Sequence, residues 1–297
     1  MEFDAGHVPV LLAETLELLA VTPGGLWVDG TLGTGGHAEA VLRMTAPDGR
    51  LLGFDRDQEA LERARVRLAP FGARVRFEHA NYREIPERLG DERASGILLD
   101  LGVSSLQLDD AERGFSFMRE GPLDMRMDRT ERGTAAEIVN RMRESELADL
   151  IHEYGEEPFS RRIARAIARA REQERIETTT RLAEIVRRAA PRSRRPGLHP
   201  ATRTFQALRI RVNRELDGLG EAIERAAACL RTGGRLVVIA FHSLEDRAAK
   251  QAFRSLAGRG FGVLTRKPLR PGEAELRTNP RARSARLRAL RREEAAP

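Results

Sequence analysis

A glycine-dense turn between an apolar strand and a helix is the feature of this chain that most restricts its fold. Residues 26–28 are apolar, residues 29–37 read Asp-Gly-Thr-Leu-Gly-Thr-Gly-Gly-His, and residues 38–44 have a helical pattern. Glycine is needed where the backbone adopts a positive φ or approaches a ligand closely, and the helix that follows offers unpaired N–H groups. The segment therefore predicts a nucleotide-type cofactor cradle.

A cradle of this kind serves both dinucleotides and S-adenosylmethionine, so the ligand has to be argued from its details. Asp29 precedes the first glycine, where its charge would repel a pyrophosphate and attract the ammonium group of a methionine moiety. The glycines read G-x-x-G-x-G-G instead of G-x-G-x-x-G. Asp55 follows at the distance expected of a ribose-binding acid. These details favour S-adenosylmethionine, and a tight connection without a ligand is the plain alternative.

Strands and helices alternate over the first hundred residues. Strand patterns occupy residues 26–30, 51–55, 75–79 and 96–101, helical runs such as 58–68 separate them, and further strands are expected at 235–241, 261–266 and 284–290. Alternation predicts a parallel sheet with helices on both faces and one ligand-binding edge. Asp29, Asp55 and Asp100 each end a strand at that edge, where an ionised acid is not a core residue.

The middle of the chain has a helical pattern only. Apolar residues at 147, 150, 151 and 154 have helical spacing, and Gly155 is expected to end that helix as its C′ residue. We expect an α/β fold of the class I (Rossmann-like) methyltransferase type, a doubly wound sheet with an inserted all-helical domain. Residues 1–108 and 203–297 would form the S-adenosylmethionine-binding domain, and residues 109–202 the insertion.

Arginine supplies most of the positive charge and is concentrated in two segments. Residues 161–195 hold twelve arginines against four glutamates, a net of +8, and residues 281–292 hold six arginines and no acid. Guanidinium groups pair with phosphate oxygens, so these segments indicate nucleic-acid binding, with solvated helix faces as the alternative. The single Cys229 excludes a disulfide framework and fits a reducing cytoplasm. The longest apolar run, residues 236–241, is too short to cross a bilayer.

Polar residues also follow the fourth and fifth parallel strands. Residues 100–110 and 113–128 face the glycine turn in a doubly wound sheet, and Asp100 and Gln107 could bond an adenosine or methionine end. Clustered carboxylates at 109, 110, 124 and 128 could bind a hard cation, but methyl transfer requires no metal and none is expected. For His242, at the end of a strand, a helix-capping or core role stands beside a catalytic one.

Nine strings in a fixed order make the chain similar to the ribosomal RNA small subunit methyltransferase H family. They are residues 7–12, 29–37, 55–57, 100–110, 114–118, 123–128, 199–209, 241–247 and 279–281, and together they span nearly the whole chain. The family transfers a methyl group from S-adenosylmethionine to the N4 amine of a cytidine in the decoding centre, the P-site region, of 16S ribosomal RNA. The resemblance therefore implies this activity, in the cytoplasm, on RNA within the small ribosomal subunit.

The resemblance also implies the residues that hold the methyl donor. They are Gly35, Gly36, His37, Asp55, Tyr82, Asp100 and Gln107, to which the turn itself adds Gly33. Many other exocyclic-amine methyltransferases carry an Asp/Asn-Pro-Pro-aromatic loop after the fourth strand, whereas residues 100–103 here read Asp-Leu-Gly-Val. Catalytic roles cannot be copied from that loop. We expect the proton acceptor among Asp100, Ser104 and His242.

Other functions remain open at the level of sequence. The chain could methylate another nucleic acid or a protein, it could be an NAD(P)-dependent oxidoreductase, or it could be a non-catalytic RNA-binding assembly factor. Asp29 disfavours the oxidoreductase because its charge opposes a phosphate in the first turn. No membrane partner is expected, and the sequence does not distinguish a monomer from a homodimer.

Overall fold

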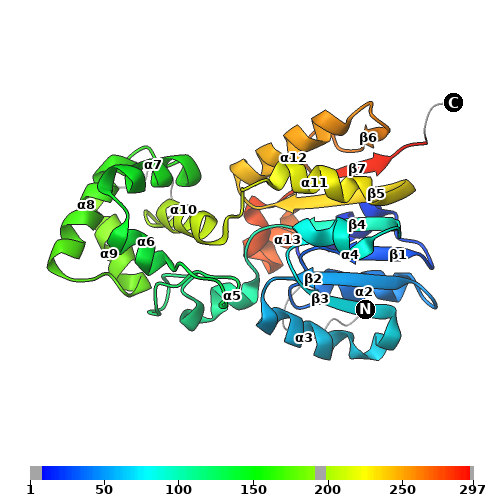
Figure 1. Ribbon diagram of the computed structural model, residues 1–297, viewed down its shortest axis with the longest axis horizontal. Coiled ribbons are helices and arrows are strands. Elements are labelled where there is room, and N and C mark those ends of the chain that lie inside the picture. Colours follow the sequence, from blue (N-terminus) through cyan, green and yellow to red (C-terminus); the bar gives the residue numbers. More distant parts are fainter. Residues whose placement is uncertain (1–8, 191–198, 295–297) are drawn as a thin grey trace. The chain divides into compact units, whose positions relative to one another are not determined.

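The computed structural model describes residues 9–190 and 199–294, which divide into two compact units. The sheet unit comprises residues 1–102 and 218–297, and the helical unit comprises residues 103–217 (Figure 1). The helical unit thus begins before the expected residue 109 and ends after the expected residue 202. His7 and Val8 of the first family string, and Arg192, Arg194 and Arg195 of the arginine-rich segment, lie outside the described residues.

Seven strands form one sheet in the sheet unit. They are β1 (Leu26–Asp29), β2 (Arg50–Asp55), β3 (Val75–His79), β4 (Ala94–Asp100), β5 (Leu230–Ala240), β6 (Phe261–Val263) and β7 (Arg286–Arg292). Their order is β3-β2-β1-β4-β5-β7-β6. Strands β1 to β5 pair in parallel, and β7 pairs antiparallel with β5 and β6. The expected doubly wound α/β fold is confirmed, with a shorter β6 than the predicted 261–266.

Helices cover both faces of this sheet (Figure 1). The helices are α1 (Leu12–Leu19), α2 (Gly36–Met44), α3 (Gln58–Leu68), α4 (Ile85–Leu89), α11 (Leu219–Ala228), α12 (Ser243–Leu256) and α13 (Glu273–Thr278). Apolar residues of α1, α2 and α3 share one buried cluster with Trp27, Leu98 and Val237. The neighbouring strand residues Ile97 and Val238 are also buried and point to the opposite face, because successive side chains of a strand alternate. Helix α11 contacts both α4 and α12.

The parallel pairing brings three carboxylates to one edge of the sheet. Asp29, Asp55 and Asp100 are the last residues of β1, β2 and β4, and these strands are neighbours in the order β2-β1-β4. Strands that run in the same direction end at the same edge, so the alternating pattern of strands and helices was sufficient to predict this row. The carboxyl edge is therefore the place to look for a ligand.

An ion-pair network joins α12 to the closing antiparallel strand. Asp246 of α12 accepts hydrogen bonds from Arg288 Nε at 2.7 Å and from Arg286 Nη1 at 3.2 Å. Arg288 is buried, and the side chain of Asp246 is mostly covered as well. An arginine in such a place requires a partner, because an unpaired buried charge is costly. Asp246, which belongs to the family string 241–247, therefore has a structural role.

The helical unit has its own apolar core. Its helices are α5 (Ser105–Asp109), α6 (Ala135–Arg141), α7 (Glu144–Gly155), α8 (Ser160–Gln173), α9 (Thr179–Ala189) and α10 (Thr202–Asn213). Buried residues at helical spacing, among them Leu147, Ile151, Ile163, Ile167 and Val186, form one cluster with the apolar residues of the loop after α5. Within the described part of the chain, no helix is long and apolar enough to span a membrane.

Two details of this unit differ from the sequence prediction. Helix α10 was expected in the sheet domain, but Phe205, Leu208 and Val212 are buried in the helical core and α10 packs on α7. Gly155 is the last residue of α7, and Glu156 with φ of 48° takes the left-handed position that Gly155 was expected to occupy. Gly155 is required for close packing, because a Cβ there would lie 2.6 Å from the Arg203 carbonyl oxygen of α10.

Replacing Asp246 by alanine tests the network between α12 and β7. The change leaves Arg288 buried without its carboxylate, and we expect it to lower the free energy of unfolding by about 3 kcal/mol. Denaturant unfolding measures the effect. Glu92→Ala is the control, because it breaks an exposed pair with Arg50 and should cost less than about 1 kcal/mol. Equal free energies of unfolding of the two variants would show that the buried Asp246 pair stabilises the fold no more than the exposed pair does.

Candidate active site

The glycine turn is built on two residues with positive φ. Gly33 has φ of +53° and Gly35, the N-cap of α2, has φ of +82°. A Cβ on Gly35 would lie 3.2 Å from Leu68, so this glycine also lets α3 pack closely. A Cβ on Gly33 would meet only the Thr31 carbonyl oxygen, at 4.0 Å. Among residues 9–190 and 199–294, the space beside Gly33 is therefore open, and a ligand can approach the backbone there.

Asp55 fixes the turn from the neighbouring strand. Its Oδ2 accepts the Gly33 N–H at 2.7 Å, and its Oδ1 accepts the Asp57 N–H at 2.8 Å. Asp57 in turn caps α3 by accepting the Glu59 N–H at 3.1 Å. The second acid of the string 55–57 is thus a helix cap, whereas Asp55 lies at the glycine turn, as expected of a residue that contacts the ligand.

His37 links the start of α2 to Asp100. Its Nε2 lies 3.1 Å from the Val10 carbonyl oxygen, and because a carbonyl can only accept, this nitrogen carries a proton. Nδ1 of the same ring lies 3.7 Å from Asp100 Oδ2. His37 is buried, so it holds a fixed orientation beside the Asp100 carboxyl group.

Thr31 is a member of the site that sequence reasoning missed. Its hydroxyl accepts the Asp100 N–H at 2.6 Å, and its own N–H donates to Asp29 Oδ1 at 3.1 Å. One small residue thereby ties the end of β4 to the turn after β1. Its position between two glycines of the turn is the only sequence signal that could have found it.

The three carboxyl groups have raised pKa values. Burial raises the pKa of Asp29 to about 7, and burial raises that of Asp55 to about 6 despite the hydrogen bonds from Asp57 and Gly33. Burial, with the charges of Asp29 and Glu245, raises the pKa of Asp100 well above its usual range. The folded ligand-free protein therefore binds these protons more tightly than the unfolded chain, so these groups lower stability as the pH rises through about 4 to 7.

Tyr82 lies beside the start of the glycine turn. It follows β3 in the short 3-10 helix Tyr82–Glu84, which Asn81 caps. A Cβ on Gly30 would lie 3.0 Å from the Tyr82 Cβ and 2.5 Å from Leu99, so Gly30 is needed for the close packing of these residues. The aromatic position that the family resemblance implied thus belongs to the same edge of the sheet as Asp29.

His242 caps a helix. Its Nδ1 accepts the Glu245 N–H at 3.4 Å, and Glu245 Oε2 accepts the Phe241 N–H at 2.8 Å and the His242 N–H at 3.3 Å. This reciprocal arrangement is a capping box at the start of α12. His242 thus has the helix-capping role that the sequence analysis set beside a catalytic one. Glu245 was overlooked, although the spacing of residues 242 and 245 could have signalled it.

Ser104 and Gln107 form a second capping box, in the helical unit. The Ser104 hydroxyl accepts the Gln107 N–H at 3.2 Å, and Gln107 Oε1 accepts the Ser104 N–H at 3.0 Å. Together they start α5. The structure thus brings Gly33, His37, Asp55, Tyr82 and Asp100 to one edge of the sheet unit. The role of Gln107 rests on the family resemblance, and that of Ser104 on its place in the sequence after β4.

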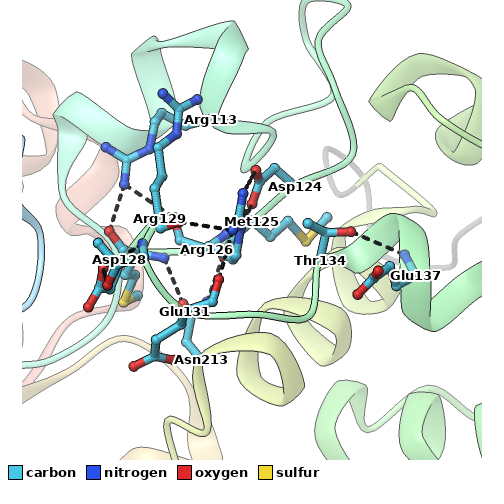
Figure 2. A network of polar contacts seen from close by, with 12 residues as sticks. Arg113, Asp124, Met125, Arg126, Asp128, Arg129, Glu131, Thr134, Glu137 and Asn213 are labelled. Atoms are coloured by element: carbon cyan, nitrogen blue, oxygen red, sulfur yellow. Dashed lines mark hydrogen bonds and ion pairs between the residues drawn. The ribbon is translucent and has the colours of Figure 1, made fainter.

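The loop after α5 is held by a polar network (Figure 2). The buried Arg113 donates to the carbonyl oxygens of Met127 at 2.9 Å and Arg126 at 3.2 Å. Asn213 bonds the Met127 N–H and the Met125 carbonyl oxygen, both at 2.8 Å. Asp124 accepts two bonds from Arg126, at 2.7 and 2.8 Å. From the sequence, Asp124 is a possible cation ligand. In the structure its carboxylate holds the loop through Arg126.

The arginines of the described 161–190 segment have different roles. Arg171 donates to the Val139 and Met142 carbonyl oxygens, at 2.8 and 2.6 Å, at the end of α6. Arg181 and Arg188 both pair with Glu184. Among the residues that the structure describes, four exposed arginines have no such partner, and they are Arg161, Arg162, Arg169 and Arg187.

The sheet edge fits S-adenosylmethionine. The buried Asp100 Oδ1 has no hydrogen-bond partner among the described residues, and the space beside Gly33 is open. The ligand has a sulfonium and an ammonium group, and a row of carboxyl groups whose charges repel one another is stabilised by a cation. Glycine turn, strand-end acid and sheet order together define a class I S-adenosylmethionine-dependent methyltransferase.

Comparison with known proteins gives the family. The model of the MraW methylase family matches residues 4–293, and the chain belongs to this family. It is 52% identical to the ribosomal RNA small subunit methyltransferase H of Symbiobacterium thermophilum, over 96% of each chain. It is 55% identical to the protein of that name from Gloeobacter violaceus, over 96% of this chain and 88% of that protein. It is 51% identical to that of Syntrophotalea carbinolica, over 96% of this chain and 98% of that protein.

Binding of the methyl donor should depend on pH. Because the pKa values of Asp29 and Asp55 are about 7 and about 6, these groups protonate as the pH falls from about 8 to 5 and lose their attraction for a cation. We expect the affinity for S-adenosylmethionine to fall over this range and binding near neutral pH to release protons. Titration calorimetry in buffers of different ionisation enthalpy measures both. Asp29→Asn should release fewer protons, and a pH-independent affinity without proton release would contradict the assignment.

Gly33→Ala separates ligand binding from folding. The new methyl group would occupy the open space of the turn, and positive φ costs an alanine roughly 1–2 kcal/mol. We expect at least about a tenfold loss of affinity for S-adenosylmethionine beyond the effect of that strain on stability. Gly233→Ala is the matched control, because Gly233 has φ of +79° and no atom within 4 Å of the added Cβ. It lies where the pairing of β5 with β4 is irregular, near the first residues of β5 and away from the carboxyl ends of the strands. Similar losses of affinity in both variants would argue against a cradle at Gly33.

Proposed function

We propose that this chain transfers the methyl group of S-adenosylmethionine to the N4 amine of a cytidine in 16S ribosomal RNA, in the decoding centre. The observation that carries this proposal is the row of carboxyl groups at the ends of β2, β1 and β4, beside an open glycine turn. Membership of the MraW methylase family and the names of the relatives support the choice of RNA as substrate.

The donor would be held by residues of the turn and of the row. Gly33, Gly35 and Gly36 present backbone, Asp55 lies at the turn, and the acids Asp29 and Asp100 complement its positive charge. When bound, the sulfonium supplies the methyl group. Tyr82 closes the cradle from the side of β3. On the resemblance, Gln107 completes this set.

Asp100 is the residue best suited to accept the proton that the amine must lose. The cytosine amine is a poor nucleophile, because its lone pair is delocalised into the ring, and an acceptor that takes its N–H proton assists the reaction. The raised pKa of Asp100 makes its carboxylate a stronger base than an ordinary aspartate. His37, at 3.7 Å with a fixed orientation, lies where it can stabilise the carboxyl group in either protonation state.

The helical unit is proposed to recognise the RNA. Four arginines of the described α8 and α9 surface are exposed without a protein partner, and the arginine-rich segment continues beyond the described residues. Each free guanidinium can neutralise a backbone phosphate, and the target cytosine must leave its stack to reach a donor. We propose that the substrate is the RNA within the small ribosomal subunit, and that the reaction takes place in the cytoplasm.

Analysis of ribosomal RNA from cells that lack this protein tests the function. We expect mass spectrometry of 16S ribosomal RNA to show loss of one methyl group from a decoding-centre cytidine, and the purified protein to restore it with labelled S-adenosylmethionine. Methylation of a protein or of another nucleic acid, with 16S ribosomal RNA unchanged, would favour those alternatives. Donor binding without any transfer would favour an assembly factor.

Asp100→Asn tests the proton acceptor. With donor and RNA saturating, the single-turnover rate should fall about a hundredfold or more, because an amide cannot take the proton. His242→Ala and His242→Asn form the matched pair. Since asparagine is a good N-cap, a capping role predicts that only His242→Ala loses stability, by about 1 kcal/mol, and that His242→Asn retains the rate. A wild-type rate for Asp100→Asn together with a large loss in His242→Asn would move the catalytic role to His242.

A further inference from the structure

Two aromatic rings lead from the core of the helical unit to its surface. Phe117 lies against the buried Phe205 in an edge-on arrangement, with centroids 4.8 Å apart. His199 lies against Phe117 with centroids 4.6 Å apart and planes tilted by 33°. Phe117 and His199 are only half-buried. The core thus holds in place a pair of rings that solvent can reach.

The His199 ring has a defined hydrogen-bonding state. The Ala201 N–H donates to its Nδ1 at 3.1 Å, so in the neutral ring the proton is on Nε2. Partial burial, and then the charge of Arg187, lower the pKa of His199 below its usual 6.5, which keeps the ring neutral at pH 7. Among the described residues, no acceptor bonds the Nε2–H group. The neutral His199 ring therefore offers one hydrogen-bond donor, its Nε2–H group.

An exposed methionine follows Phe117 in the same loop. Met118 is 81% exposed, and its N–H donates to the Ser116 hydroxyl at 3.2 Å. Glycines hold the two ends of this loop, because a Cβ on Gly114 would lie 2.2 Å from the Pro122 carbonyl oxygen, and one on Gly121 would lie 1.9 Å from that of Ala111. The loop therefore fixes an apolar side chain in solvent, where nothing in the fold requires it.

A positive charge acts on the His199 ring. Arg187 of α9 is exposed, has no ion-pair partner among the described residues, and its charge helps to lower the pKa of His199. Its neighbour Arg188 pairs with Glu184 instead. Aromatic rings beside a free guanidinium are the combination that proteins use to bind single-stranded nucleic acid, with bases on the rings and phosphates on the cations.

We propose that Phe117, Met118, His199 and Arg187 form a docking surface for one nucleotide of single-stranded RNA, separate from the cytidine that is methylated. The nucleobase stacks on the ring and thioether surface, the His199 Nε2–H donates to a base acceptor, and Arg187 binds a phosphate. The surface takes any base with an exposed face, because stacking depends little on sequence. This inference rests on the proposed function, which it deepens by assigning the residues that position the RNA.

Met118→Ser tests the surface against a matched control. Val66→Ser removes an apolar side chain that is 79% exposed on α3, where no aromatic pair was found. For Met118→Ser we expect about a tenfold larger dissociation constant for a mixed-sequence single-stranded RNA. We also expect a similar rise of KM for 16S ribosomal RNA, with kcat unchanged. Val66→Ser should match the wild type. RNA binding that is unchanged in Met118→Ser, as expected if Met118 anchors a protein partner, would overturn the proposal.

His199→Ala and His199→Phe separate stacking from the hydrogen bond to the Ala201 N–H. Both variants lose the acceptor for the Ala201 N–H, but only phenylalanine retains a ring against Phe117. We expect His199→Ala to bind RNA about tenfold more weakly, and His199→Phe to recover most of that loss, at equal thermal stability. Arg187→Gln should reduce the slope of log affinity against log salt by about one. Equal losses of RNA affinity in both His199 variants would overturn stacking.

The outcomes also separate this inference from the proposed function. A wild-type protein that binds single-stranded RNA through these residues but transfers no methyl group to 16S ribosomal RNA supports the docking surface and contradicts the function. A wild-type protein that methylates this RNA, with Met118→Ser and His199→Ala unchanged in both dissociation constant and KM, supports the function and overturns the docking surface.

Discussion

Repulsion between carboxyl groups at adjacent strand ends is the constraint on which the sheet unit depends. Parallel pairing places Asp55, Asp29 and Asp100 in one row, and Glu245 adds its charge to the field at Asp100. Backbone N–H groups stabilise part of this charge, at Asp29 from Thr31 and at Asp55 from Gly33. Among the described residues, the buried Oδ1 of Asp100 has no hydrogen-bond partner, and in the proposed function a cationic ligand stabilises its charge.

The fold and much of the site could be predicted from the sequence because both follow from local rules. The alternation of strands and helices fixes the direction of β1 to β5, and direction alone places the ends of these strands together. Asp55 and Asp100 follow from the same rule because each ends a strand, and Gly33 follows from the glycine turn after β1, whereas His37 was implied by the family resemblance. The family strings added Tyr82, whose place beside Gly30 depends on packing between elements that are distant in the sequence.

What the sequence did not predict depends on contacts between side chains and distant backbone. The contact of Thr31 with the Asp100 N–H joins residues that are 69 positions apart, and the place of Thr31 between two glycines does not show that Asp100 is its partner. A glycine at position 155 is typical of a helix end, but here it lets the Arg203 carbonyl oxygen of α10 pack closely. Helix α10 itself was assigned to the wrong unit because its amphipathic pattern shows that one face is buried, but does not show which core buries it.

The number of arginines in the 161–195 segment does not show what each described arginine does. A sequence count treats Arg171, Arg181 and Arg187 alike, yet the first caps the end of α6, the second pairs with Glu184, and the third is exposed without a partner in the described structure. An arginine of the last kind is the best placed to release counterions when RNA binds, because Glu184 already neutralises Arg181 and backbone carbonyl oxygens hold the guanidinium of Arg171. The charge available to RNA is therefore smaller than the net charge of the segment and confined to particular positions. One of these positions is Arg187, whose charge acts on the His199 ring, and on the proposed docking surface it would bind a phosphate while the rings stack on a base.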